Sequence, residues 1–173
     1  MRYCFLICIL FIFQIGQLFG QRIFVDQNIM VPFSRTYNPL NRDCINGKFE
    51  AYKSLQQAIE NATYGDTISI REGFLRDTIN VKLNKDNTGY LSIMNYKDER
   101  VVIDGNNPDI GPLIKIQSDR IKIQGLVILH SNSFGIYSHN TNDVTIKNCE
   151  VAYSNDGGIV FVDASNIKIS YCH

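Results

Sequence analysis

The sequence lacks several features that would assign it to a common class of protein. Its 173 residues include no tryptophan and only four prolines, and 17 lysines and arginines balance 17 aspartates and glutamates. Nucleic-acid phosphates are bound by clustered lysines and arginines, so a neutral chain without a basic run argues against nucleic acid as a partner. Neither a Gly-rich phosphate loop nor a nucleophile elbow occurs. The composition, 45% hydrophobic, suits one soluble domain.

The longest apolar run lies at the N-terminus. Arg2 precedes the run Phe5–Phe13, and a slightly more polar stretch ends at Gly20. This order is typical of a secretory signal peptide over residues 1–20, with cleavage after Gly20. A retained membrane anchor is the alternative, but the run is short against the about 20 residues of a membrane span. We therefore expect a secreted, extracellular protein with no membrane attachment after cleavage.

Short runs of alternating apolar and polar residues recur at a fixed spacing. Ile123, Ile146 and Ile169 are equally spaced in three such runs, and Ile70 and Ile93 show the same separation earlier in the chain. This period, roughly 23 residues, falls in the range of about 20–50 residues that indicates stacked repeats, each of which buries its apolar face against its neighbours. Because the apolar spacing within each run alternates and β-branched residues dominate, the repeats are predicted to be built from strands.

Each repeat is predicted to supply three short strands, so that like strands of successive repeats form columns. Parallel stacking fits, because each connection within a column is a full circuit of about 20 residues. Strand alternation then points Ile121 and Ile123 inward and Lys122 outward. The predicted columns are 67–70, 91–94, 120–124, 143–147 and 166–170 for the first, 101–103, 126–129 and 149–152 for the second, and 79–81, 113–116, 135–137 and 158–162 for the third.

The N-terminal part has a different pattern. Residues 21–53 show no sustained periodicity, and we interpret them as an extended lead-in with one strand at residues 23–25. Ser54 and Gln57 make a capping box for a helix over residues 54–62, which is predicted to end near Gly65 in the left-handed conformation and to cap the stack. Residues 54–173 form the repeat domain. It is expected to be incomplete at its C-terminus, because His173 falls inside a repeat.

One interval of the first column is longer than the others. Ile93 and Ile123 are separated by more than one regular period, and the extra residues fall within Asp104–Pro112. Insertions in repeat proteins become loops, often on the functional face. A tolerated surface loop is the favoured interpretation, because lengthening a loop costs little stability.

Several stretches together resemble a known group of proteins. They are Ser54-Leu-Gln-Gln-Ala-Ile-Glu60, Tyr64-Gly-Asp-Thr-Ile-Ser-Ile70, Val101-Val-Ile-Asp-Gly105, Ile123-Gln-Gly-Leu-Val-Ile128, Val144-Thr-Ile-Lys-Asn148 and Gly157-Gly-Ile159. The chain resembles right-handed parallel β-helix proteins of the pectin-lyase-like superfamily, of the chondroitinase B, alginate lyase and mannuronan epimerase type. The resemblance implies an all-β, right-handed parallel β-helix that acts on extracellular polysaccharide. No run matches a catalytic motif of pectate lyases or polygalacturonases, so no catalytic residue is assigned.

The resemblance also raises the question of Ca²⁺ as a cofactor. A uronate lyase neutralises a carboxylate with calcium or another cation and removes the neighbouring proton with a base. Calcium takes several oxygen ligands, for which the sequence offers Asp104, Asp109, Asp143 and Glu150. Solvated turn carboxylates are the favoured interpretation of these residues.

Lysines and aromatic residues are the other candidates for contact with a glycan. Lys122 and Lys168 are predicted to point outward in one column, with Lys147 near them, where they could meet an acidic glycan. Lysine on an exposed sheet also protects against aggregation, and that interpretation is favoured. Tyr137 and Tyr153 could stack on sugars, although tyrosine on a sheet usually packs.

The histidines and two asparagines give weaker signals. His130, His139 and His173 show no metal-ligand spacing, and solvated loop histidines are expected. Asn132 and Asn155 share a position in successive repeats, which predicts a structural asparagine ladder.

Cysteines are few. Signal cleavage would leave Cys44, Cys149 and Cys172, an odd number for an oxidising compartment. Cys149 and Cys172 are equivalent residues of adjacent repeats, where either a disulfide or a stack of two buried thiols fits; the thiols are favoured. Asn61 begins an Asn-Ala-Thr sequon and is the predicted glycosylation site of a secreted chain.

The leading hypothesis is a secreted β-helix protein that binds or modifies an extracellular polysaccharide, with lyase-like β-elimination or epimerisation as the chemistry if it is an enzyme. A non-catalytic structural or adhesive solenoid is the alternative, and an inactive fragment is a third hypothesis. Whether the protein is an enzyme cannot be decided from periodicity, because all three hypotheses need the same core.

Overall fold

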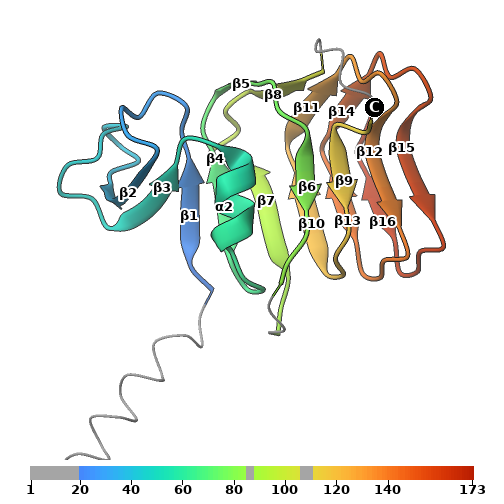
Figure 1. Cartoon of the computed structure of the whole chain (residues 1–173), viewed down its shortest axis with the longest axis horizontal. Helices are drawn as coiled ribbons and strands as arrows, with labels where there is room; N and C mark the ends of the chain where they lie inside the picture. The colour runs from blue at the N-terminus through green and yellow to red at the C-terminus, as the bar shows by residue number, and fades with distance from the viewer. Residues whose placement is uncertain (1–19, 85–87, 106–110) are drawn as a thin grey trace, which may run out of the picture.

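The computed structural model describes residues 20–84, 88–105 and 111–173 (Figure 1). The predicted signal peptide, except for Gly20, and the middle of the Asp104–Pro112 insertion lie outside these ranges. Within the described ranges, no helix is both long and apolar enough to cross a membrane.

Three sheets run side by side along the molecule, and the chain passes through them in turn. The first sheet has eight strands in the spatial order β16-β13-β10-β7-β4-β1-β3-β2. Its strands are β1 (Arg22–Val25), β2 (Phe33–Tyr37), β3 (Phe49–Tyr52), β4 (Thr67–Ile70), β7 (Leu91–Asn95), β10 (Ile121–Gln124), β13 (Thr145–Lys147) and β16 (Lys168–Ser170).

The other two sheets have four strands each and complete the circuit. The second sheet contains β5 (Gly73–Leu75), β8 (Val101–Asp104), β11 (Leu126–Leu129) and β14 (Glu150–Ala152), and the third contains β6 (Ile79–Val81), β9 (Ile114–Ile116), β12 (Phe134–His139) and β15 (Gly157–Val162). Like strands of successive rungs pair in parallel, from β4-β5-β6 through β13-β14-β15. The predicted parallel β-helix with three-strand rungs is therefore confirmed, and among the strands from β4 to β16 only β5 was missed.

Aliphatic side chains from the three sheets fill the interior. Ile121, Ile123, Val144 and Ile146 are fully buried, as strand alternation predicts. Ile169, which lies opposite Ile146 in the last rung, is 48% exposed because no further rung of the described chain covers it.

The register of the first rung corrects one prediction. Ile93 lies opposite Ile68, whereas Ile70 lies opposite Asn95. The first interval therefore starts at Ile68 and is slightly longer than the regular period. The two isoleucines of β4 share one face, so counting isoleucines could not tell them apart.

The lead-in is more structured than predicted. Besides β1, which pairs with β4 as an additional turn of the first column, it contains β3, parallel to β1, and β2, antiparallel to β3. This segment has a small core of its own outside the main one, formed by Phe24, Ile29, Tyr37 and Ala51. Figure 1 shows it at the N-terminal end of the stack, beyond β4.

The capping helix forms as predicted at its start. Helix α2 (Leu55–Asn61) begins after Ser54, whose side chain accepts a hydrogen bond from the Gln57 amide at 3.4 Å, and it buries Leu55, Ala58 and Ile59 over the end of the core. Its predicted end is wrong. The helix ends at Asn61, its C-cap residue Ala62 has extended backbone, and Gly65 takes its positive φ of 96° in the turn before β4 instead.

Left-handed backbone recurs from rung to rung at the corners between strands. Four sets of residues at equivalent positions of successive rungs have positive φ. The sets are Arg120, Asp143 and Asn166; Gly125, Asn148 and Tyr171; His130 and Tyr153; and Asn140 and Asp163. Asparagine and aspartate tolerate this region better than other side chains do, because they bond to the local backbone. Their frequency at these corners therefore follows from the stacking of equal turns.

Substitutions at Asn148 test the importance of this corner conformation. Asn148 is exposed, with a φ of 52°, and Gly125 occupies the same corner one rung earlier. We expect Asn148→Val to lower the free energy of unfolding by about 1–2 kcal/mol, the cost of a left-handed residue, and Asn148→Gly to leave it equal or slightly higher. Urea denaturation measures both.

The matched control is Lys147→Val, at the exposed strand residue next to Asn148. Because valine suits a strand, this change should be close to neutral. Equal losses in Asn148→Val and Lys147→Val would contradict the role assigned to the corner.

Candidate functional site

The outward face of the first sheet carries two straight rows of side chains, because the strands pair in register. The first row is Arg22, Thr67, Ser92, Lys122, Thr145 and Lys168, and the second is Phe24, Ser69, Met94, Gln124, Lys147 and Ser170. We call these two rows the outer rows. All of their members are described residues, and none of them is an aspartate or glutamate.

The outer rows confirm the predicted alignment of lysines. Lys122 and Lys168 share one row with Thr145 between them, Lys147 lies in the adjacent row, and all three lysines are exposed. Rungs are about 4.8 Å apart, so Lys122 and Lys168 are separated by about 10 Å. The Lys122 ammonium lies 4.1 Å from the centre of the Tyr90 ring, a contact that fixes the cation above the sheet.

The lead-in folds over the N-terminal end of the outer rows. Phe24 is buried there beneath the ring of Tyr37, which is 5.2 Å away, and beside Phe49 and Tyr96, at 5.1 and 5.3 Å. Ser69, the next residue of the row, is also buried. The lead-in thus shortens the part of this face that solvent reaches.

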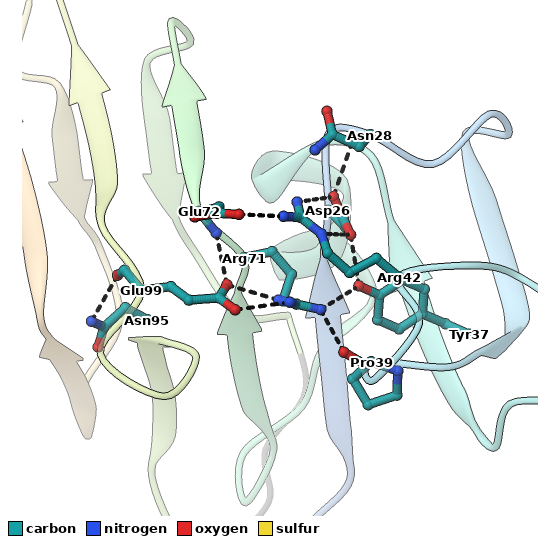
Figure 2. A network of polar contacts seen from close by, with 9 residues as sticks. All are labelled: Asp26, Asn28, Tyr37, Pro39, Arg42, Arg71, Glu72, Asn95 and Glu99. Atoms are coloured by element: carbon teal, nitrogen blue, oxygen red, sulfur yellow. Dashed lines mark hydrogen bonds and ion pairs between the residues drawn. The ribbon is translucent and has the colours of Figure 1, made fainter.

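A buried polar network holds the lead-in in place (Figure 2). Asp26, which directly follows β1 and is fully buried, accepts hydrogen bonds from the Tyr37 hydroxyl at 2.6 Å and from Arg42 Nε and Nη2 at 3.0 and 2.8 Å. Arg42 Nη1 also donates to Glu72 Oε1 at 2.7 Å. A carboxylate so enclosed by donors keeps its charge without water.

Arg71 extends the network by one rung. Its guanidinium donates to both oxygens of Glu99, at 2.8 Å each, to the Tyr37 hydroxyl at 3.0 Å and to the Pro39 carbonyl at 2.7 Å. It also lies over the Tyr96 ring, 4.9 Å from the centroid. Figure 2 shows Arg71 between the lead-in and the turn that carries Glu99, so the arginine joins the two.

The network keeps both carboxylates ionised at neutral pH. Burial alone would raise the pKa of Asp26, but hydrogen bonds from Arg42 and Tyr37 hold that pKa below its usual value. Burial opposes ionisation of Glu99 in the same way, and the bonds from Arg71 hold the pKa of Glu99 below its usual value. Burial and the bond to Asp26 raise the pKa of Tyr37, which therefore remains a hydrogen-bond donor.

Neutralising Asp26 tests whether this network holds the fold. Asp26→Asn leaves Arg42 without its buried counter-charge, and we expect it to lower the free energy of unfolding at pH 7 by about 3–5 kcal/mol. The lowered pKa values mean that this stabilisation is present above the unfolded carboxyl pKa of about 4 and is lost as pH falls through the folded values.

Thermal denaturation between pH 7 and pH 3 measures both effects. The difference between wild type and Asp26→Asn should shrink toward low pH, whereas Asp77→Asn, at an exposed carboxylate, should follow the wild type throughout. A difference that is constant with pH would contradict the charge-based explanation.

The carboxylates considered for calcium do not come together where the structure describes them. Asp104 ends β8 and Glu150 begins β14 in the second sheet, whereas Asp143 precedes β13 of the first sheet, and Asp109 lies outside the described residues. In the parts of the chain that the structure describes, no three His, Cys, Asp or Glu residues gather closely enough to hold a metal ion. The three described candidates, Asp104, Asp143 and Glu150, therefore do not form a calcium site together.

Three of the candidate residues do meet, outside the outer rows. His130 Nδ1 lies 3.0 Å from Asp104 Oδ1, and the His130 ring stacks on Tyr153 with centroids 5.2 Å apart and planes at 15°. His130 and Tyr153 occupy the same corner of successive rungs, and Tyr153 is 74% exposed. The sequence analysis named all three residues but did not predict their contact. The separation of His130 and Tyr153 by one regular period could have predicted that they lie at the same corner of successive rungs.

The remaining histidine and tyrosine candidates are separate from one another. Tyr137 stacks on Phe134 at 5.3 Å, which agrees with a packing role. His139 Nε2 lies 3.4 Å from a carboxylate oxygen of Asp163, and both side chains are exposed; His173 is exposed as well.

The turns before the first sheet carry a polar ladder that the sequence analysis did not find. The Asp119 carboxylate accepts a hydrogen bond from the backbone N–H of Asn142 at 2.8 Å. One rung further on, the Ser165 hydroxyl donates to the side-chain oxygen of Asn142. Asn132 and Asn155 are both exposed, and the ladder expected between them stays a prediction.

Cys149 and Cys172 are free thiols, as the favoured interpretation expected. Cys149 is buried in the core and Cys172 packs against it. Burial raises the pKa of Cys149 to about 11. Asn61 ends α2 with its side chain exposed, and its Nδ2 donates to the Gln57 carbonyl at 2.9 Å. Its glycosylation stays a prediction.

Thiol labelling tests the buried position of Cys149. With a pKa of about 11, only about one Cys149 thiol in a thousand is ionised at pH 8. In the native protein we expect iodoacetamide to modify Cys44 at least about tenfold faster than Cys149, because the thiolate is the reactive form. Peptide mapping by mass spectrometry separates the two sites, and labelling in urea provides the control. Equal native rates would contradict burial.

Comparisons with known proteins agree with this geometry. The family model described as "Right handed beta helix region" matches residues 94–173. The uncharacterized protein YwoF of Bacillus subtilis (strain 168) is 33% identical over 113 residues, which are 58% of this chain and 24% of that protein. The chain therefore spans about a quarter of the length of this curated relative.

A solved structure shares the architecture over most of the chain. The crystal structure of pectate lyase Pel9A matches with a TM-score of 0.53 and 13% identity, covering 90% of this chain and 48% of that one. At this identity the likeness concerns the fold. The chain has the right-handed parallel β-helix fold of the pectin-lyase-like proteins, as its resemblance to them implied.

Proposed function

We propose that this protein is a secreted β-helix protein that binds an acidic extracellular polysaccharide along the outer rows of its first sheet. The observation that carries the proposal is the charge of that face: Arg22, Lys122, Lys147 and Lys168 project from it, with no carboxylate in either row. A polyanion is the partner that such a face complements.

The arrangement of the rows suits an extended polymer. The cations are aligned along the axis of the stack and separated by small hydroxyl residues such as Thr145 and Ser92. A linear uronan presents a carboxylate on every sugar and hydroxyls between them, so it can pair with successive rungs. Exposed ion pairs contribute little individually, which makes affinity depend on the number of rungs covered and on salt.

The outer rows supply only part of what a lyase needs. Their cations could neutralise a uronate carboxylate, but the described residues provide no calcium site, and no residue is assigned as the base. The fold shared with pectate lyase Pel9A supports polysaccharide as the partner class without supplying a reaction. A non-catalytic adhesive solenoid uses the same face, and β-elimination would be recognised by the absorbance of unsaturated ends in the treated glycan.

Charge reversal on the outer rows tests the proposal. The double variant Lys122→Glu with Lys168→Glu should weaken binding to polygalacturonate or alginate at low salt by about tenfold or more, because two attractive contacts become repulsive. Wild-type binding should fall as salt is added. Both lysines are exposed strand residues, so the variant should remain folded, with only the small loss of stability that follows from removing the Lys122 contact with Tyr90.

The matched control is Lys82→Glu with Lys115→Glu, which changes net charge equally but lies at the third sheet. This control should bind within about twofold of the wild type if the face, rather than net charge, is responsible. Equal losses in both double variants, or wild-type binding to neutral glucans as strong as to uronans, would contradict the proposal.

A further inference from the structure

A pocket of about 480 Å³ lies where the lead-in meets the outer rows. Its apolar lining comes from the rings of Phe24, Phe49 and Tyr96, and from Leu40 of the lead-in. Arg22 and Lys48, both exposed, are its charged residues. The volume is within the range of small-molecule sites in proteins.

We propose that this pocket binds the terminal uronate residue of the acidic polysaccharide, so that the protein recognises chain ends. The inference rests on the proposed function and specifies how the same glycan would be held. The ligand of the pocket is then one acidic sugar unit at the end of a polysaccharide chain.

The lining fits such a unit chemically. A pyranose has an apolar C–H face that packs on aromatic rings, and Phe49 and Tyr96 are partly exposed around the buried Phe24. A uronate carboxylate would find two cations, Arg22 and Lys48, and none of the described residues that line the pocket is acidic. An aromatic surface with a cationic rim favours an acidic sugar over a neutral one.

Continuity with the outer rows explains why the occupant is the end of a chain. Arg22 both lines the pocket and begins the row that continues to Lys122 and Lys168. On the other side, the lead-in is fixed by the Asp26 and Arg71 network and covers the end of the face. A chain lying along the row would therefore end against the lead-in.

The pocket is rigid at its base. Tyr96, which lines it, lies under the Arg71 guanidinium, and Pro39, also in the lining, accepts a hydrogen bond from that arginine. The same network that stabilises the lead-in thus shapes the pocket before any ligand binds, which lowers the cost of binding.

The test compares a disaccharide with its polymer, using digalacturonate with polygalacturonate and dimannuronate with alginate. A disaccharide that fills the pocket lies about three rungs, or about 14 Å, from Lys122, whereas a polymer reaches all of the row. Calorimetry or ligand-observed NMR measures both affinities for the full chain and its variants.

The discriminating variant is Lys48→Glu, because Lys48 is exposed and belongs to the pocket but not to the outer rows. We expect it to weaken disaccharide binding by about tenfold, the order of effect of one charge-assisted contact, while polymer binding falls by less. Lys122→Glu with Lys168→Glu should show the reverse pattern. Lys53→Glu, at an exposed lysine outside this pocket, should change neither, and melting curves verify that each variant is folded.

Two results would overturn the inference and are distinguishable from each other. Polymer binding that depends on Lys122 and Lys168, with disaccharide binding absent or unaffected by Lys48→Glu, would refute the pocket and leave the proposed function in place. No binding of either polymer by the wild type would refute both.

Discussion

The structure depends on one constraint, the parallel pairing of each strand with its equivalents in the preceding and following rungs. Pairing in register places like residues about 4.8 Å apart in columns, so every choice at one position is repeated along the stack. Inward, this produces the aliphatic columns that include Ile123 and Ile146. At the corners, it repeats left-handed backbone at Arg120, Asp143 and Asn166. The pairing that aligns the core residues therefore also aligns the residues on the surface.

On the outward face, the same pairing arranges residues that are one repeat apart in the sequence into straight rows of side chains. Lys122 and Lys168 are two repeats apart in the sequence but share one row, and the rows are free of carboxylates. The lead-in breaks this regularity at the N-terminal end, where Asp26, Arg42 and Arg71 fasten it across the face. The long repetitive surface and the pocket at its end therefore arise from two different kinds of interaction.

Sequence periodicity predicted most of the β-helix because the repeat is local and regular. Ile123, Ile146 and Ile169 identified the first column, and the outward position of Lys122 followed from strand alternation alone. Ile70 was assigned to the wrong partner because the first rung is slightly longer than the regular period and β4 offers two isoleucines on one face. The strands β2 and β3 were missed because they depend on contacts such as that of Asp26 with Arg42, and such contacts produce no periodic pattern in the sequence. The contact of Asp104 with His130 joins two different rungs and required the fold to be known.

Mapping by NMR tests the central claim, that the outer rows are the surface that meets an acidic glycan. Amide and lysine side-chain signals of the isotope-labelled protein would be followed during titration with oligogalacturonate and with oligomannuronate. The account predicts that the shifts concentrate in β10, β13 and β16 and around Arg22, while the outward residues of β9, β12 and β15 remain unchanged. Shifts centred on the second or third sheet would contradict it, as would their absence with both oligosaccharides.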